Sequence, residues 1–149
     1  MTSPTAVRYD PWLDLNQNWP HVDLVVESMS GDLLGEVRGD GAVIALRADT
    51  SGAQRRCTLA HEIVHLERGL PVDDSWLYRE EALVHRETAR RLIPLAELGA
   101  AIRAAGGDHD RAALAQALDV DRDTLDVRLA DLQRWERVQI RRRLRRHSA

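Results

Sequence analysis

Apolar and polar residues follow one another in a way that predicts short strands in the first third of the chain. β-Branched runs occupy residues 22–29 and 41–47, and turn-forming Gly and Asp residues flank a shorter apolar segment at 33–37. The simplest arrangement of three such neighbours is a meander, in which each strand is antiparallel to the next. Residues 1–20 hold few bulky apolar side chains and are expected to form an arm that packs across a surface.

After these strands, the apolar residues recur at the spacing of a helix. No Gly or Pro interrupts residues 54–68, and their apolar side chains recur on one broad helical face. A second helix is predicted from about residue 74 to residue 93, with Asp73 or Asp74 as its N-cap and with Pro94 beyond its end. Three further helices are predicted at 94–105, 111–118 and 124–144.

These elements predict an α+β fold. A small three-stranded antiparallel sheet packs on the helix at 54–68 and on the helix at 74–93, and a helical C-terminal region follows. We expect a core of residues 1–96 and a helical extension of residues 97–149 that ends in a basic tail. A length of 149 residues is near the usual size of one domain, so both parts should fold as one unit.

Composition places the chain among ordinary globular proteins. Hydrophobic residues make up 44% and charged residues 30%, and the core must be aliphatic because aromatics make up only 4%. The single cysteine, Cys57, cannot form an intramolecular disulfide, which fits a reducing compartment. No apolar run approaches the roughly 18 residues of a membrane span, and the N-terminus lacks a signal-peptide pattern. We therefore expect a cytoplasmic protein without a membrane partner.

Residues 61–65 read HEIVH and carry the clearest chemical signal in the chain. Positions i and i+4 of a helix share one face, so His61 and His65 can bind one divalent ion, with Glu62 beside them as a general base. Zinc held by two His and one carboxylate keeps one position open, where the pKa of water falls to about 7. The alternative is a pair of structural histidines. The apolar neighbours favour a metal, because buried polar groups need partners.

A third ligand is expected from the next predicted helix. Glu81 shares a helical stripe with His85, so we expect Glu81 to bind zinc and His85 to hydrogen-bond a ligand or the substrate and fix its orientation. Glu80 is the alternative ligand. Without a metal, this acidic cluster is a solvated helix face, with an ion pair between Glu87 and Arg91.

The sequence supports a role in the site less strongly for other polar residues. Cys57 lies one helical turn before His61, but it fits better as a small buried apolar residue than as a metal ligand. Tyr78, His21 and His109 are candidate donors to an oxyanion, with no spacing that favours one of them.

The two helical motifs resemble those of the ImmA/IrrE family of metallopeptidases. Residues 56–66 read RCTLAHEIVHL, and VHRETARRLIP follows Glu81 after two residues. The family pairs a TLAHExxH helix with a later helix of the pattern ExxAN..A..LLMP. The similarity is close over residues 54–94 and only general elsewhere. The departures are Val84 and His85 in place of Ala and Asn, and Ile93 in place of Met.

That resemblance implies a zinc-dependent endopeptidase that acts on a protein partner, typically a helix-turn-helix repressor. It implies that His61, His65 and Glu81 bind Zn²⁺ and that Glu62 is the catalytic general base. An extended peptide is a natural target, because the early strands offer an edge for strand addition. The alternative is a regulatory protein that keeps the metal fold but docks a repressor or DNA without cutting.

The C-terminal third combines helix-turn-helix-like apolar spacing with uneven charge. Asp119 occupies the position where a turn Gly often lies. Residues 108–131 hold seven Asp and three Arg, a net charge of −4, whereas residues 134–149 hold seven Arg and one Glu, a net charge of +6. The acidic segment favours a scaffold or protein-docking role over DNA binding. The basic tail suits nucleic acid or an acidic partner, but Arg near a helix C-terminus also suits the macrodipole, so nucleic acid is not the favoured partner.

Overall fold

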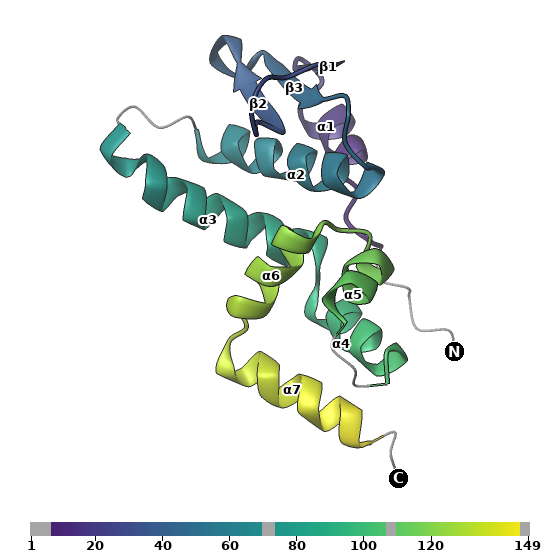
Figure 1. Ribbon diagram of the computed structural model, residues 1–149. Helices are drawn as coiled ribbons and strands as arrows, with labels where there is room; N and C mark the ends of the chain where they lie inside the picture. The colour runs from purple at the N-terminus through teal and green to yellow at the C-terminus, as the bar shows by residue number, and fades with distance from the viewer. Residues whose placement is uncertain (1–6, 70–73, 107–109, 147–149) are drawn as a thin grey trace.

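The computed structural model describes residues 7–69, 74–106 and 110–146 and confirms the α+β class. A small sheet lies at one end, the long helices α2 and α3 run beneath it, and α7 lies at the opposite end (Figure 1). No helix in the described part of the chain combines the length and the apolar character that crossing a membrane requires. The elements, in chain order, are α1 (Pro11–Asn18), β1 (Asp23–Glu27), β2 (Gly35–Arg38), the 3₁₀ turn η1 (Gly39–Gly41), β3 (Val43–Arg47), α2 (Gly52–Arg68), α3 (Asp74–Leu92), α4 (Leu95–Ala104), α5 (Arg111–Leu118), α6 (Arg122–Ala130) and α7 (Arg134–Arg145).

Most element boundaries agree with the sequence pattern, and two segments differ. The N-terminal segment expected to be an arm contains a helix, α1, whose N-cap Asp10 accepts hydrogen bonds from two backbone N–H groups. The predicted helix at 124–144 is two helices, α6 and α7. The predicted N-cap of α3, Asp73 or Asp74, lies outside the residues whose side chains are described.

The sheet is mixed, so the predicted antiparallel meander is wrong. Its strand order is β1-β3-β2, with β1 parallel to β3 and β2 antiparallel to β3. The central strand β3 is also the most buried one, because Ile44, Ala45 and Leu46 are at most 1% exposed. Strands β1 and β2 carry charged residues and become the two edges, where charge is tolerated and discourages further pairing.

Charged side chains also occupy the outer face of the sheet. Arg38 of β2 donates hydrogen bonds to Glu36 on its own strand, at 2.5 Å, and to Glu27 of β1, at 2.6 Å. Residues alternate between faces along a strand, and Gly35 approaches α2, so Glu36 and Arg38 lie on the opposite face. The sheet therefore has one solvent-exposed face and one face that packs against α2.

Helix α2 covers the packed face. Leu59 and Ile63 of α2 join Ile44 and Leu46 of β3 in one buried cluster, to which Leu15 of α1 also belongs. Strand β2 lies close to α2, since a Cβ placed on Gly35 would be 2.5 Å from Cγ2 of Thr58. This close approach brings an edge strand next to the helix that carries the HEIVH motif.

A second apolar cluster unites α2 with the C-terminal helices. It contains Cys57 and Ala60 of α2, and it extends through residues on both sides of the predicted division at residue 96. The later members are Leu92, Ile93, Leu98, Ile102, Leu114, Ala115, Leu118, Val120, Leu125 and Ile140. The division into a core and an extension stays a prediction, and the packing that crosses it is continuous.

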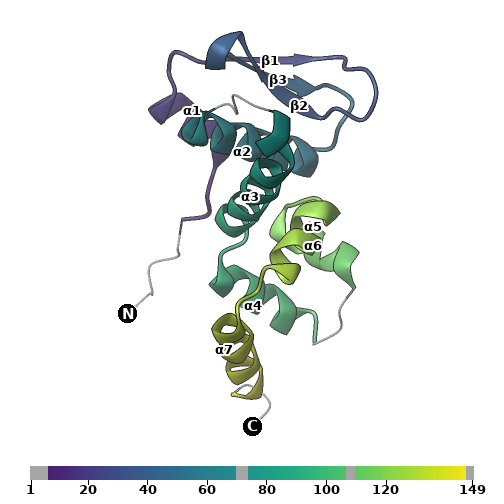
Figure 2. The ribbon, with the colours of Figure 1, turned by 90° about the vertical axis from the view of Figure 1, so that its left-hand side faces the viewer.

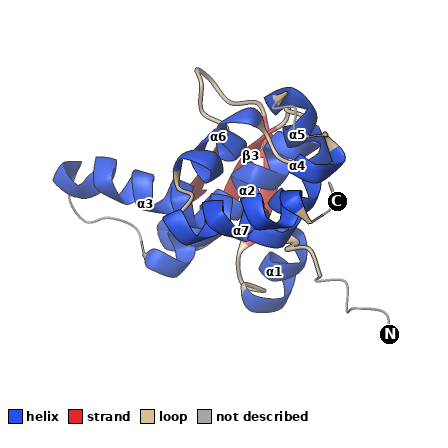
Figure 3. Ribbon diagram, turned by 90° about the horizontal axis from the view of Figure 1, so that it is seen from below, coloured by secondary structure: helices blue, strands red, loops and turns tan. Residues whose placement is uncertain are grey.

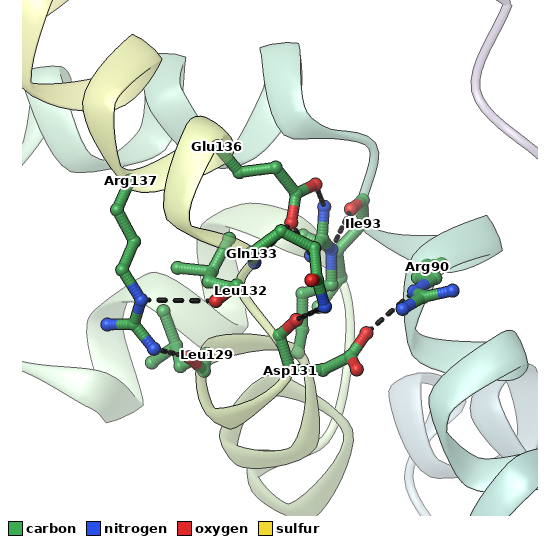
Figure 4. Close-up of polar contacts among 9 residues, drawn as sticks. Arg90, Ile93, Leu129, Asp131, Leu132, Gln133, Glu136 and Arg137 are labelled. Carbon is green, nitrogen blue, oxygen red and sulfur yellow. Dashed lines mark hydrogen bonds and ion pairs between the residues drawn. The ribbon is translucent and has the colours of Figure 1, made fainter.

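Polar contacts at the α6–α7 turn explain why one predicted helix became two (Figure 4). Glu136 accepts a hydrogen bond from the backbone N–H of Gln133 at 2.9 Å, as part of a capping box that starts α7. Arg128, only 3% exposed, donates to Glu136 at 2.7 Å and to the carbonyl oxygen of Ile93 at 2.9 Å. Asp131 forms an ion pair with Arg90 of α3 at 2.6 Å. The turn is thereby tied to the end of α3.

Candidate metal centre

Helix α2 positions two imidazoles toward α3. A capping box starts the helix, with Ser51 accepting from the backbone N–H of Gln54 at 3.1 Å. His61 and His65 follow one turn apart on the same face, and their Nε2 atoms are 3.1 Å from each other. Both nitrogens thus point to one place, beside the neighbouring helix.

Glu81 of α3 reaches the same place. Its Oε1 lies 2.9 Å from Nε2 of His65, and its Oε2 lies 3.4 Å from Nε2 of His61. Tetrahedral zinc with bonds of about 2.0–2.1 Å holds its donors about 3.3 Å apart. The structure therefore brings the three predicted ligands together at separations that fit this ion, while their metal-binding roles stay predictions.

The alternative ligand, Glu80, faces elsewhere. Both of its carboxylate oxygens pair with the guanidinium of Arg68, and the Nη2–Oε2 distance is 3.0 Å. This hydrogen-bonded partner lowers the pKa of Glu80. The expected ion pair between Glu87 and Arg91 is present at 3.1 Å. Glu80 and Glu87 thus have partners of their own outside the donor cluster.

His85 lies beside the donor cluster without a hydrogen bond to it. Its Nε2 is 3.8 Å from Oε2 of Glu81, which is too long for such a bond, and its ring centroid is 4.6 Å from that of His61. His61, Glu81 and His85 form a second group whose donor atoms lie within 4.8 Å of one another. The group with His65 is the tighter of the two, so we favour it as the ligand set. The orienting role predicted for His85 stays a prediction.

Burial shapes the protonation of the site. Burial and the neighbouring His85 and His65 lower the pKa of His61 to about 3, so its imidazole is neutral and can offer a lone pair. Burial, with the carboxylates of Glu81 and Glu36, raises the pKa of Glu62 to about 8. Glu62 is 6% exposed and lies next to the donor cluster, as a proton acceptor for this chemistry must.

One buried atom of the cluster lacks a partner. Nδ1 of His65 has no hydrogen-bond partner among the described residues. Histidines that bind metals usually donate the second ring N–H to a carbonyl or carboxylate. His65 therefore relies on packing and on its Nε2 contacts for its orientation.

The donor cluster opens into a cleft of about 550 Å³. Gly35, the first residue of β2, forms one wall, and Thr88 of α3 lies on the other side with His85. Asp121 and Thr124, at the start of α6, close a further side. No sequence pattern predicts the α6 wall, because α6 reaches the cleft only through packing between distant segments.

Two of the candidate oxyanion donors, Tyr78 and His21, do not reach this cleft. Tyr78 is 88% exposed, and His21 lies against Trp19, with ring centroids 6.1 Å apart. Neither contributes to the lining of the cleft. His109 lies outside the described residues.

Cys57 is a structural residue that borders the cleft. It is 4% exposed, and its sulfur accepts a hydrogen bond from the backbone N–H of Asp121 at 3.4 Å. Burial, with the charge of Asp121, raises the pKa of its thiol to about 11. A thiol with a raised pKa is a poor metal ligand and a poor nucleophile at neutral pH.

Comparisons with models of protein families, with curated proteins and with solved structures give no match.

Proposed function

We propose that this protein is a zinc-dependent endopeptidase. The observation that supports the proposal is the convergence of His61, His65 and Glu81 from two helices, with the buried carboxyl of Glu62 next to them in an open cleft. Two imidazoles and one carboxylate are a ligand set of catalytic zinc sites, which leave a coordination position free.

Zinc bound to these residues supplies a Lewis acid that polarises a carbonyl group and lowers the pKa of a water molecule. Glu62 accepts the proton of the attacking water and delivers it to the leaving amine. In the ligand-free site its pKa of about 8 keeps the carboxyl protonated at neutral pH. A nearby positive charge lowers the pKa of a carboxyl group, so the loaded site favours the form of Glu62 that accepts a proton.

The cleft suits an extended segment of a protein substrate. Strand β2 pairs only with β3, so its other edge is unpaired within the described residues. Leu34 and Gly35 at the start of β2 line the cleft together with α2, the helix that carries the HEIVH motif. A peptide added along this edge would form main-chain hydrogen bonds while its backbone passes the donor cluster. By the family resemblance, we propose a helix-turn-helix repressor as the substrate and the cytoplasm as the location.

The test is peptide cleavage by zinc-loaded protein, using a library of extended peptides with new N-termini identified by mass spectrometry. Glu62→Gln should retain zinc and lose about 10²- to 10⁴-fold in rate, the usual contribution of general acid–base catalysis. Glu67→Gln is the matched control, because Glu67 lies on the same helix and pairs with Arg91. Unchanged cleavage by the Glu62 variant, or a wild-type protein that binds no zinc, would contradict the proposal. Regulatory activity that survives Glu62→Gln would favour docking without cutting.

A further inference from the structure

The outward face of α7 carries arginines that no packing argument explains. Arg134, Arg141, Arg142 and Arg145 are exposed, and none has an ion pair with a described residue. They span about 16 Å along the helix axis, from the rise of 1.5 Å per residue. We propose that this face of α7 binds the phosphate backbone of nucleic acid.

The inward face of α7 packs against the rest of the protein. Glu136, Ile140 and Leu144 recur at steps of four and turn toward the protein, where Ile140 is 8% exposed and belongs to the C-terminal apolar cluster. At 100° per residue, Arg142 and Arg145 fall on the side opposite these three residues. The cationic face is therefore turned to solvent.

Stabilisation of the helix accounts for only part of this charge. Cations in the last turn favour the negative end of the helix dipole, which explains Arg142 and Arg145 in part. Arg134, by contrast, is the first residue of α7, at the positive end, where a cation is unfavourable. Arg137 shows what a structural arginine does here, because it donates to the carbonyl oxygen of Leu132 at 3.1 Å.

The same face presents an aromatic ring among the cations. Trp135 is 58% exposed and Val138 is 38% exposed, and both lie between Arg134 and Arg142 on the outward face. An exposed aromatic ring among guanidinium groups is the arrangement that stacks on bases while the cations contact phosphates. A lipid surface fits less well, since arginines alternate with Trp135 and Val138 on the outward face and leave no continuous apolar face to enter a bilayer.

The position of α7 also favours a polyanion. Helix α7 lies at the end of the molecule away from the sheet and the donor cluster (Figure 2), and it is in front of the other helices when the molecule is seen from that end (Figure 3). The start of α6 carries Asp121 and Asp123, which repel phosphate. The phosphate backbone is therefore expected to contact the outward face of α7, and α6 does not enter a groove as a recognition helix would.

The test is the salt dependence of binding to a fluorescein-labelled DNA duplex of mixed sequence, measured by fluorescence anisotropy. Each phosphate contact adds about 0.9 to the slope of log affinity against log salt. Loss of two contacts in R142Q/R145Q should lower the slope by about 1.8, so over a fourfold rise in salt the wild type loses about 12-fold more affinity than the variant. The matched control is R79Q/R86Q, which removes two exposed arginines from α3.

Further variants and ligands distinguish duplex DNA, single-stranded DNA and a lipid surface as the partner of α7. Trp135→Ala should weaken binding to single-stranded DNA by about tenfold and affect the duplex less, because stacking needs unpaired bases. Arg134→Gln provides an independent variant at the other end of α7, with an expected slope change of about 0.9. Equal slopes for R142Q/R145Q and R79Q/R86Q, no DNA binding at low salt, or binding to phosphatidylserine vesicles but not to DNA would each overturn the proposal.

Discussion

Two adjacent glutamates with different partners determine the composition of the candidate metal centre. Neighbouring residues on a helix point about 100° apart, so Glu80 and Glu81 cannot face the same group. Arg68, the last residue of α2, forms an ion pair with Glu80. The imidazoles of His61 and His65 face Glu81 instead. The ion pair outside the centre thus helps to set which carboxylate is inside it.

We predict that Glu81→Gln lowers zinc affinity by more than about 100-fold. Mutation of a residue that only hydrogen-bonds a metal ligand already lowers metal affinity by about 10- to 100-fold, and a direct ligand should matter more. Glu80→Gln should leave zinc affinity nearly unchanged, because it removes an exposed ion pair outside the donor cluster. Competition with a fluorescent zinc chelator measures both affinities. Loss of zinc in the Glu80 variant alone would reverse the assignment.

At this scale the sequence located the donor residues because the relevant rule is local. A spacing of four on a helix fixes the relation of His61 to His65, and a helical stripe singled out Glu81. The distance of His85 from the cluster, and the contribution of Asp121 to the cleft wall, depend on how distant helices pack. No spacing rule contains that information.

The element that most depends on a single residue is β2. Its contact with α2 exists because Gly35 has no side chain, with Thr58 and the carbonyl oxygen of Ala45 both near the position of a Cβ. The carbonyl oxygen belongs to the backbone and cannot turn away. The edge strand and the HEIVH helix are therefore neighbours only while a glycine lies between them.

Gly35→Ala should lower the free energy of unfolding by about 1–3 kcal/mol, the usual cost of overpacking. The matched control is Gly52→Ala at the start of α2, where a Cβ would meet nothing within 4 Å and no loss is expected. Urea denaturation followed by circular dichroism measures both variants. Equal stability of the Gly35 variant and the wild type would show that β2 does not need this close approach.

Element types were more predictable than their arrangement. Helix α5 begins and ends where the apolar spacing places it, and the φ of 55° at Asp119 confirms the turn predicted there. The strand order was not predictable from a local pattern, because the burial of β3 depends on pairing across the chain. The break between α6 and α7 contains no Gly or Pro, and only the cap formed by Gln133 and Glu136 marks it.

At the scale of the whole molecule, the buried ion pair between Arg128 and Glu136 links α6 to α7. Arg128 of α6 binds Glu136 of α7 and the carbonyl oxygen of Ile93 at the end of α3, and both charged side chains are nearly inaccessible. Figure 4 shows Glu136 at this junction. The hydrogen bond from Arg128 lowers the pKa of Glu136. The folded state thus favours ionised Glu136, and the stability this adds is present above the ordinary pKa of 4.5 and is lost as the pH falls through the lowered value.

Glu136→Gln should cost about 3–5 kcal/mol at pH 7, because it leaves Arg128 buried without a counter-charge. The difference between wild type and variant should shrink as the pH is lowered below 4.5, where wild-type Glu136 takes up a proton. Urea denaturation at a series of pH values measures the difference. Glu87→Gln, which breaks an exposed pair, should differ from wild type by less than about 1 kcal/mol throughout. A pH-independent difference for Glu136→Gln would contradict the assigned protonation.

The charged outer face of the sheet constrains how this fold is built. A second layer laid over Arg38, Glu27 and Glu36 would have to desolvate all three, so helices accumulate on the opposite side alone. The result is a one-sided stack in which the helices lie beneath the sheet and α7 is the farthest from the strands (Figure 1). Such growth separates the two proposed binding surfaces by the length of the stack, so that a peptide held at one end leaves the other end free for a polyanion.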